Sequence, residues 1–294
     1  MKLKIDPASF KYTPGKSKPL SETSTEVTDL YESKKEYRSL LKEYTQEIDE
    51  LQSMMYAHGK YSMLLIFQGM DSAGKGGAIR HVMSGINPAG VHVSTFKRPS
   101  SLELRHDWMW RSTCKLPLRG HIGIFDRSYY EEVLVVRVHP GILTGAQLIP
   151  HHKTENVEQV FQERRQDIVN FEDFLYRNGT HVVKFFLNLG YEEQRQRLLD
   201  RINEPSKNWK MNPGDVKERG RWSDYQKAFQ EVLDDTSKEN APWYVIPADD
   251  KKNARLIISQ IVLEEMSKLK MEYPRGDAES QEELAECKRI LLSD

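Results

Sequence analysis

The stretch SMLLIFQGMDSAGKGGAIR, residues 62–80, sets a glycine-rich loop between an apolar run and a helical pattern. The loop has the GxxxxGK spacing of a P-loop, in which backbone N–H groups point inward at phosphate oxygens and the lysine adds a full charge. The following helix adds the positive end of its dipole. We therefore expect phosphate to be bound by Gly69, Ala73, Gly74, Lys75, Gly76 and Gly77. The alternative is a glycine-rich turn with a structural purpose only.

Two residues of this loop depart from a standard P-loop. Gly76 stands where Ser or Thr normally ligates Mg²⁺, and an acid, Asp71, lies inside the loop. A carboxylate close to a phosphate chain is repulsive unless a cation lies between them. We therefore predict that Asp71 binds Mg²⁺, with Mn²⁺ as an alternative, or that it orients a phosphate acceptor through the metal.

Short apolar runs alternate with helical patterns along the chain. The expected strands are residues 62–67, 91–96, 121–126, 181–189 and 243–248. The helical patterns between them cover residues 102–113, 157–176, 192–202 and 224–233. Strands that alternate with helices indicate an α/β fold with a parallel sheet covered on both faces. Such a sheet binds ligands at the carboxyl ends of its strands, so the functional residues should converge there.

The composition divides the chain into three parts. Residues 1–24 are rich in Pro, Lys, Ser and Thr and predict an irregular arm. Residues 25–272 form the predicted single domain, which begins with an amphipathic helix over 25–58 and includes a lid at about 195–222. Residues 273–294 form a tail with a helical patch. The apolar stripe of the first helix indicates a packing helix, or alternatively a dimer seam; we expect a homo-oligomer, a dimer or a tetramer.

The composition excludes several classes of protein, although the net charge by itself excludes none. The 294 residues are 38% hydrophobic and carry a net charge of -1, so a polyanion binder would have to concentrate its cations in a cleft. Two cysteines are too few for a disulfide framework. The N-terminus has no apolar core of a secretory signal, and no run approaches the roughly 20 apolar residues of a membrane span. We therefore expect a cytoplasmic protein that does not bind membranes. Binding to nucleic acid is not expected either, because no extended basic face with interleaved aromatics is found.

A second motif, HIGIFDRSYYEEVLVVRVH, covers residues 121–139. Asp126 ends an apolar strand, where a Walker-B carboxylate holds Mg²⁺, and the guanidinium of Arg127 suits bidentate phosphate binding. The alternative is that both residues only cap the next helix. Arg137 could reach a phosphate or form a surface ion pair, and Glu131 is a weaker candidate because acids are common at helix starts.

Cations are concentrated in the predicted lid. Between Arg195 and Arg221 there are eight Lys and Arg residues and four acids. Helical spacing puts Arg197 and Arg201 on one face. We favour a set of cations that closes over a phosphate chain and excludes water, with a solvated charged face as the alternative. Lys97 and Arg98 follow a strand, where they could hold a phosphate or a nucleotide.

Six segments resemble the type-2 polyphosphate kinases in the same order along the chain. They are GMDSAGKGG, GINPAGV, FKRPS, IFDRSYYEEVLVVRVH, EPSKNWK and APWYVIPADDKKNAR, within about residues 30–270. The resemblance implies a P-loop kinase fold similar to thymidylate kinases, with three α/β/α layers, a five-stranded parallel sheet and a helical lid. It also implies a reversible, Mg²⁺-dependent transfer of a terminal phosphoryl group from inorganic polyphosphate to AMP, ADP and their guanine counterparts.

The resemblance also implies roles for individual residues. Asp71 and Asp126 are expected at the metal, and Lys75 with Arg127 at the phosphates. Nucleotide binding is expected from Lys97, Arg98, Arg127, Glu131 and Arg137, and polyphosphate binding in the lid from Arg201, Lys207 and Lys210. The family pattern itself accepts the glycine at position 76 and the acid at 71. Glu131 resembles the subclass that accepts both AMP and ADP, since the ADP-specific type usually has Asn there.

Two other functions fit the same motifs. In an ATP-dependent nucleoside monophosphate kinase, the loop at residues 69–75 would hold the β- and γ-phosphates of ATP. A nucleotide switch or scaffold without turnover is the second alternative, although the NKxD motif of a GTPase is not found. The choice of phosphate donor separates the first alternative from a polyphosphate kinase.

Overall fold

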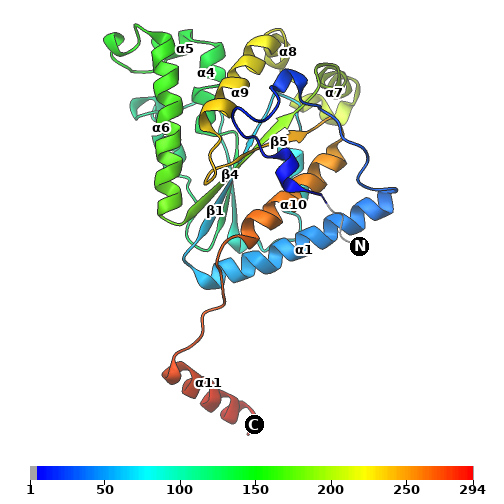
Figure 1. Cartoon of the computed structure of the whole chain (residues 1–294), viewed down its shortest axis with the longest axis vertical. Coiled ribbons are helices and arrows are strands. Elements are labelled where there is room, and N and C mark those ends of the chain that lie inside the picture. The colour runs from blue at the N-terminus through cyan, green and yellow to red at the C-terminus, as the bar shows by residue number, and fades with distance from the viewer. Residues whose placement is uncertain (1–4, 294) are drawn as a thin grey trace.

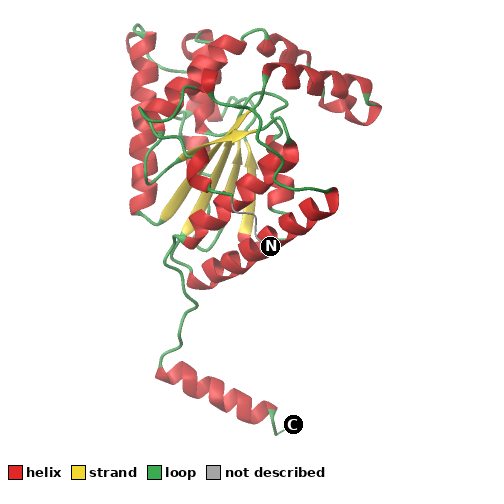
Figure 2. Ribbon diagram, turned by 45° about the vertical axis from the view of Figure 1, so that its right-hand side comes forward, coloured by secondary structure: helices red, strands yellow, loops and turns green. Residues whose placement is uncertain are grey.

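Five parallel strands form one sheet at the centre of the structure, a computed structural model that describes residues 5–293 (Figure 2). The strands are β1 Ser62–Gln68, β2 Val91–Thr95, β3 Ile122–Asp126, β4 Thr180–Asn188 and β5 Trp243–Pro247. Their order in the sheet is β2-β3-β1-β4-β5, and every neighbouring pair is parallel. The predicted five-stranded parallel sheet is therefore confirmed. Because β1 is central, the loop that follows it opens at the middle of the carboxyl edge.

Helices cover both faces of the sheet (Figure 1). One face packs against α1 Lys34–His58, α2 Lys75–Val82 and α10 Lys251–Ser267. The other face packs against α4 Val135–Val138, α6 Val157–Arg177 and α9 Trp222–Thr236. Alternation along β1 supplies both cores, since Leu65 belongs to the first and Leu64 to the second. This arrangement confirms the predicted three-layer α/β/α fold.

The first helix begins later than predicted. Helix α1 starts at Lys34, where the Ser33 hydroxyl accepts a hydrogen bond from the Glu36 amide at 3.1 Å, and the expected start at residue 25 is wrong. The preceding residues run along α10 instead: the Leu30 amide donates to the Asn253 side chain at 3.1 Å. These contacts use backbone groups that a helix would use internally. Self-association through α1 stays a prediction, which light scattering would test.

The described part of the N-terminal arm is ordered against the body. It contains two 3₁₀ helices, η1 Pro7–Phe10 and η2 Leu20–Glu22, and is otherwise irregular as expected. Tyr12 and Leu20 are each 5% exposed and belong to the core on the α9 side. The Tyr12 amide donates to the Trp243 carbonyl at 2.8 Å, so the arm lies along the outer edge of β5. Residues 1–4 of the predicted arm lie outside the described residues.

The helix expected over residues 102–113 is interrupted. It forms η4 Glu103–Arg105 and α3 Trp110–Thr113. The carboxylate of Asp107 accepts hydrogen bonds from the amides of Met109 and Trp110, both at 3.0 Å. An Asp that binds the backbone just ahead of it favours a new helix start over continuation. The intervening residues therefore run as a loop beside the sheet edge.

The remaining elements connect these strands and helices or follow the last of them. They are η3 Pro88–Gly90, η5 Tyr129–Glu132, α5 Gly141–Gly145, η6 His151–Lys153, α7 Tyr191–Asn203, η7 Pro205–Lys210, α8 Pro213–Arg219 and α11 Ala278–Leu291. The predicted lid thus consists of most of α7 with η7 and α8. Helix α11 stands apart from the body in both views (Figures 1 and 2). Within residues 5–293, no helix is long and apolar enough to cross a bilayer.

Candidate active site

The loop between β1 and α2 has the backbone of a phosphate cradle. Gly69, Ser72 and Gly74 have positive φ angles of 151°, 68° and 102°. A β-carbon on Gly69 would lie 3.0 Å from the carbonyl oxygen of Leu187, so only glycine fits where the loop leaves the sheet. Helix α2 begins at Lys75, directly after the second glycine. The loop N–H groups and the helix N-terminus therefore meet at one point, as a bound phosphate requires.

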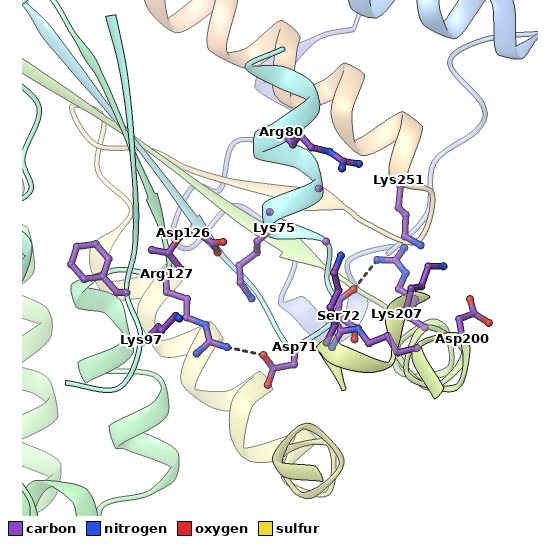
Figure 3. A pocket seen from close by; sticks show the side chains of 18 residues that line it. Asp71, Ser72, Lys75, Arg80, Lys97, Asp126, Arg127, Asp200, Lys207 and Lys251 are labelled. Carbon is purple, nitrogen blue, oxygen red and sulfur yellow. Dashed lines mark hydrogen bonds and ion pairs between the residues drawn. The ribbon is translucent and has the colours of Figure 1, made fainter. Parts of the chain in front are cut away.

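A cavity of about 620 Å³ opens over this loop, and we call it the P-loop cavity (Figure 3). It is lined by Asp71, Ser72, Gly74, Lys75, Gly76, Gly77, Arg80, Thr95, Phe96, Lys97, Asp126, Arg127, Arg197, Asp200, Arg201, Lys207, Lys210 and Lys251. Nine of these residues are Lys or Arg and three are Asp. A chain with a net charge of -1 thus concentrates its cations here, as a polyanion site requires.

The four predicted catalytic side chains line this one cavity. The guanidinium of Arg127 pairs with the carboxylate of Asp71 at 2.8 Å, and both face the same space as Lys75 (Figure 3). The Lys75 ammonium donates to the Gly69 carbonyl at 2.6 Å. Oδ2 of Asp126 lies 3.6 Å from where a β-carbon on Gly76 would stand, so this carboxylate reaches the start of α2. The P-loop and the end of β3 therefore build one site.

Burial and neighbouring carboxylates shift the pKa values of Lys75 and Arg127 in opposite directions. Burial lowers the pKa of Lys75, and the carboxylate of Asp71 opposes that shift. For Arg127, burial also acts to lower the pKa, but Glu131 and Asp71 outweigh it and the pKa is raised. The backbone of Arg127 has a φ of 66°, which is rare for a residue with a side chain. Such strain is often found where the surrounding structure must hold a functional side chain in place.

Two of the three aspartates that line the cavity, Asp71 and Asp126, fit a hard divalent cation. Asp71, inside the P-loop, and Asp126, at the end of β3, offer carboxylate oxygens, which are the ligand type that Mg²⁺ prefers. Mg²⁺ is usually held by one or two carboxylates, and phosphate and water complete its shell. Within residues 5–293, no cluster of three or more His, Cys, Asp or Glu side chains could hold a metal by itself. A metal here would therefore be shared between the protein and a bound phosphate.

Arg197 differs from the other lid cations in a way that the sequence did not reveal. Its side chain is 5% exposed, and it donates to the carbonyl groups of Ser72, Ala73, Ala248 and Asp249 at 2.7–3.1 Å. Its remaining N–H pairs with Glu193 at 2.7 Å. The guanidinium therefore joins the P-loop to the loop after β5. Helical spacing could place it on the inner face of α7 but could not tell a clamp from a ligand.

The predicted polyphosphate residues all line the cavity but are more loosely held. Among the described residues, Lys207 pairs only with nearby Glu204, at 2.7 Å, and Lys210 lies 5.0 Å from the ring centre of Trp209. Arg201 forms an ion pair with a lid carboxylate, Asp215, at 2.9 Å. The ends of these side chains can turn toward an anion without breaking the core.

Two further cations of the cavity were missed by the sequence analysis. Arg80 projects from α2, five residues after Lys75, and Lys251 is the first residue of α10 (Figure 3). Burial lowers the pKa of Lys251, and neighbouring Arg197 adds to that shift. The sequence did contain a signal for Lys251, because it follows the end of a strand, as Lys97 does.

A second cavity of about 490 Å³, the flanking cavity, adjoins the first. Both are lined by Phe96, Lys97 and Arg127. Arg98 and Glu131 also line the flanking cavity, and burial raises the pKa of the Glu131 carboxyl although Arg127 opposes the shift. Four of the five predicted nucleotide residues are thus brought together. Nine of its 19 lining residues are apolar or aromatic, whereas Phe96 is the only such side chain among the described residues that line the P-loop cavity.

The fifth predicted nucleotide residue, Arg137, lines neither of these two cavities. Its guanidinium pairs with Glu158 at 2.8 Å and with Glu231 at 3.2 Å, and lies 5.3 Å from the ring centre of Phe161. These contacts join α4 to α6 and α9. The alternative that the sequence left open, an ion pair, matches this position.

Comparison with known proteins decides which P-loop kinases are related to the chain. The family model for polyphosphate kinase 2 matches residues 31–274. The chain belongs to the polyphosphate kinase 2 family. It is 48% identical over 291 residues to a protein of Rhodopseudomonas palustris named ADP-polyphosphate phosphotransferase, covering 99% of this chain and 100% of that protein. It is 41% identical over 234 residues to the AMP/ADP-polyphosphate phosphotransferase of Meiothermus ruber, covering 80% and 82%.

A solved structure gives the same result. The crystal structure of polyphosphate kinase 2 from Arthrobacter aurescens matches with a TM-score of 0.85 and 35% identity, over 97% of this chain and 98% of that one. The predicted family, its fold and a phosphotransferase activity between polyphosphate and nucleotides are therefore confirmed. Polyphosphate kinases of this family are phosphoryl-transfer enzymes that need a divalent metal.

Proposed function

We propose that the protein transfers the terminal phosphoryl group of inorganic polyphosphate to ADP and to AMP, and to GDP and GMP, in a reversible reaction that requires Mg²⁺ or Mn²⁺. The relatives named above differ in acceptor, one being named for ADP and one for both AMP and ADP. Glu131, which lines the flanking cavity, supports acceptance of both.

The charge of the P-loop cavity is the observation that carries this proposal. Nine cationic side chains and three carboxylates line it, and this excess of positive charge suits a polyphosphate chain that carries one negative charge per phosphate unit. The alternative, an ATP-dependent monophosphate kinase, would need room for a donor base beside the donor phosphates. Phe96 is the only aromatic side chain among the described residues that line this cavity, and it is shared with the flanking cavity. The lining therefore favours polyphosphate over a nucleotide as donor.

The flanking cavity supports an acceptor nucleotide beside the donor chain. Its apolar and aromatic wall suits a base and ribose, and Lys97 and Arg127, at its junction with the P-loop cavity, suit the acceptor phosphate. The phosphoryl group would thus pass from one cavity to the other beside Arg127. A donor and an acceptor bound at adjoining cavities gain the rate advantage of a fixed geometry.

The reaction needs charge stabilisation more than covalent chemistry, because the transition state spreads negative charge over the three equatorial oxygens of the phosphoryl group. Lys75 and Arg127 would neutralise that charge, together with the loop N–H groups. Asp71 orients the Arg127 guanidinium through their 2.8 Å ion pair. A divalent cation held by Asp71 and Asp126 would supply further neutralisation of the phosphate oxygens. The lid, with Lys207 and Lys210, would exclude water and so suppress hydrolysis.

One experiment tests the proposal directly. Purified protein is incubated with Mg²⁺, long-chain polyphosphate and, separately, AMP, ADP, GMP or GDP, and the products are separated by chromatography. We expect phosphorylated product from each acceptor and none when a chelator is present. Product formed from AMP only when ATP replaces polyphosphate would instead identify a monophosphate kinase.

A further inference from the structure

The flanking cavity continues into a third one. The outer cavity, about 470 Å³, lies between the loop around Trp108, the segment that follows α5, and helix α6; α5 and α6 stand next to α4 in Figure 1. The flanking and outer cavities are both lined by Pro99, Leu104, Trp108, Arg111, Glu132 and Gln147. The shared wall means that a ligand whose phosphates lie at Arg127 can extend toward α6. The six residues therefore lie where such a ligand would pass from the flanking cavity into the outer one.

Two of these six residues belong to a buried polar triad. Glu132 is 7% exposed and Arg164 is 3% exposed, and they form an ion pair of 3.0 Å. Arg164 also donates to the side-chain oxygen of Gln147 at 2.6 Å, and the Gln147 amide nitrogen donates to Glu132. These bonds fix which end of the Gln147 amide faces which partner. The triad presents a fixed pattern of polar atoms at the junction of the two cavities.

One oxygen of the triad has no partner. Both side-chain hydrogen bonds to Glu132 use Oε2, and within residues 5–293 no side chain or amide donates to Oε1. That oxygen is not among the fully buried unpaired atoms of the described residues, so it is open to the cavity that the residue lines. A buried ion pair is weak support for stability, since desolvation offsets its attraction. A carboxylate oxygen aimed into a cavity is, in contrast, a fixed hydrogen-bond acceptor.

Trp108 supplies a flat surface at the same junction. Its indole lines both cavities, and the Arg164 guanidinium lies 5.4 Å from the ring centre. The contact with a buried arginine holds the indole in place. An aromatic ring beside a hydrogen-bond acceptor is the usual means of binding a nucleobase, through stacking on one face and recognition of one edge.

We propose that the base of the acceptor nucleotide stacks on Trp108 and donates a hydrogen bond from its exocyclic amino group to Oε1 of Glu132. This inference rests on the proposed function, because it assigns the base end of the same acceptor. Glu132 is then a specificity-determining residue, distinct from Glu131 beside it. Gln147 and Arg164 are positioning residues that orient its carboxylate.

The chemistry of the carboxylate sets the preference. An ionised carboxylate only accepts hydrogen bonds. Adenine and cytosine carry an exocyclic amino group that can donate, whereas hypoxanthine and uracil carry a carbonyl oxygen at the same position of the ring. That oxygen would face Oε1 and repel it. Two comparisons between acceptors with bases of equal size, ADP with IDP and CDP with UDP, therefore test recognition of the amino group independently of the size of the base.

The first test uses the unmodified protein. Initial rates are measured at saturating polyphosphate for ADP, IDP, CDP and UDP, and the ratios of kcat/KM are taken within each pair. We expect at least about a fivefold preference for the amino base in both pairs, as one hydrogen bond to a charged group allows. A smaller ratio in either pair overturns the inference. Absence of any product from polyphosphate would instead overturn the proposed function, so the two failures are distinct.

Variants locate the contact. Trp108→Leu should raise KM for ADP about tenfold and leave KM for polyphosphate within about twofold, which simple misfolding would not do. Trp110→Leu is the matched control, because Trp110 stacks on His106 at 3.9 Å and lines neither cavity. Glu132→Gln should bring the ADP-to-IDP ratio close to one, since an amide can donate to the hypoxanthine oxygen. An unchanged KM in Trp108→Leu, or an unchanged ratio in Glu132→Gln, contradicts the inference; the unmodified protein decides it if either variant fails to fold.

Discussion

The two sides of the P-loop cavity carry the same charge but hold it differently. On the sheet side, where α7 of the lid packs against the P-loop, Arg197 is almost fully buried and all its hydrogen bonds go to the protein, four of them to backbone carbonyls. On the lid side, Lys207 is 44% exposed at its side chain and pairs with a single neighbour three residues away. Both residues line the same cavity. Positive charge in a phosphate site therefore does not by itself identify a ligand.

The difference between the two sides shows in what the protein would lose if each side chain were removed. Removing Arg197 leaves buried carbonyl oxygens without donors, and the cost of such groups falls on folding. Removing Lys207 breaks an exposed ion pair, which contributes about 0–1 kcal/mol. The sheet side is thus organised before a substrate arrives, while the lid side can reorganise around one. Catalysis by fixed charges needs the first property, and closure over a long anion needs the second.

The largest effect is expected for Lys75, the sheet-side cation that a phosphate bound in the P-loop would meet. Lys75→Ala should lower kcat by a factor corresponding to about 3 kcal/mol or more of lost transition-state stabilisation, comparable to loss of a well-placed oxyanion donor. Because burial already opposes its charge, the melting temperature should change little. Steady-state assays and thermal melts check this, with Lys60→Ala as an exposed control. Near-normal turnover would show that the P-loop cavity is not the reaction site.

Arg197→Met should affect stability first. The buried carbonyls of the P-loop and of the loop after β5 lose their donor, so the free energy of unfolding should fall by about 2–3 kcal/mol. Denaturant titration measures this. The matched control is Arg195→Met, two residues along α7, whose side chain is 65% exposed and whose pair with Glu192 is solvent-screened. Equal destabilisation by the two substitutions would show that Arg197 does not stabilise the fold by joining the P-loop to the loop after β5.

Lys207→Ala combined with Lys210→Ala should act on the donor alone. KM for polyphosphate should rise about tenfold, with weaker dependence on salt, because two screened charges no longer attract the chain. KM for ADP and the free energy of unfolding should stay close to those of the parent. A salt titration of the initial rate checks the charge effect. If KM for polyphosphate is unchanged, the lid does not bind the donor chain.

The sequence predicted the strands, the layers and most cations of the site because those depend on local patterns. Apolar runs set the strands, and the motifs around Asp71 and Asp126 had to meet once the strands were parallel. It could not predict which cation is a clamp, since Arg197 and Arg201 have the same helical spacing and differ only in what packs against them. Nor could it predict the break at Asp107, where side-chain hydrogen bonds override helical periodicity.

The smallest effect concerns the glycine that replaces the usual hydroxyl of a P-loop. A β-carbon on Gly76 would lie 3.6 Å from Oδ2 of Asp126, which is an ordinary contact, and the backbone φ of Gly76 is not positive. Gly76→Ser should therefore fold and gain about 0.5 kcal/mol from better helix propensity at the start of α2. If the Asp71 carboxylate supplies the metal ligand that the hydroxyl supplies elsewhere, kcat should stay within about threefold.

The double variant Gly76→Ser with Asp71→Asn sharpens this test. Asp71→Asn alone removes both a metal ligand and the 2.8 Å partner of Arg127, so its turnover should fall at least about tenfold. A serine at position 76 should restore part of that loss if its cause is the metal, and none if its cause is the freed arginine. Turnover measured across a range of Mg²⁺ concentrations separates the two, because only a lost metal ligand is offset by more metal.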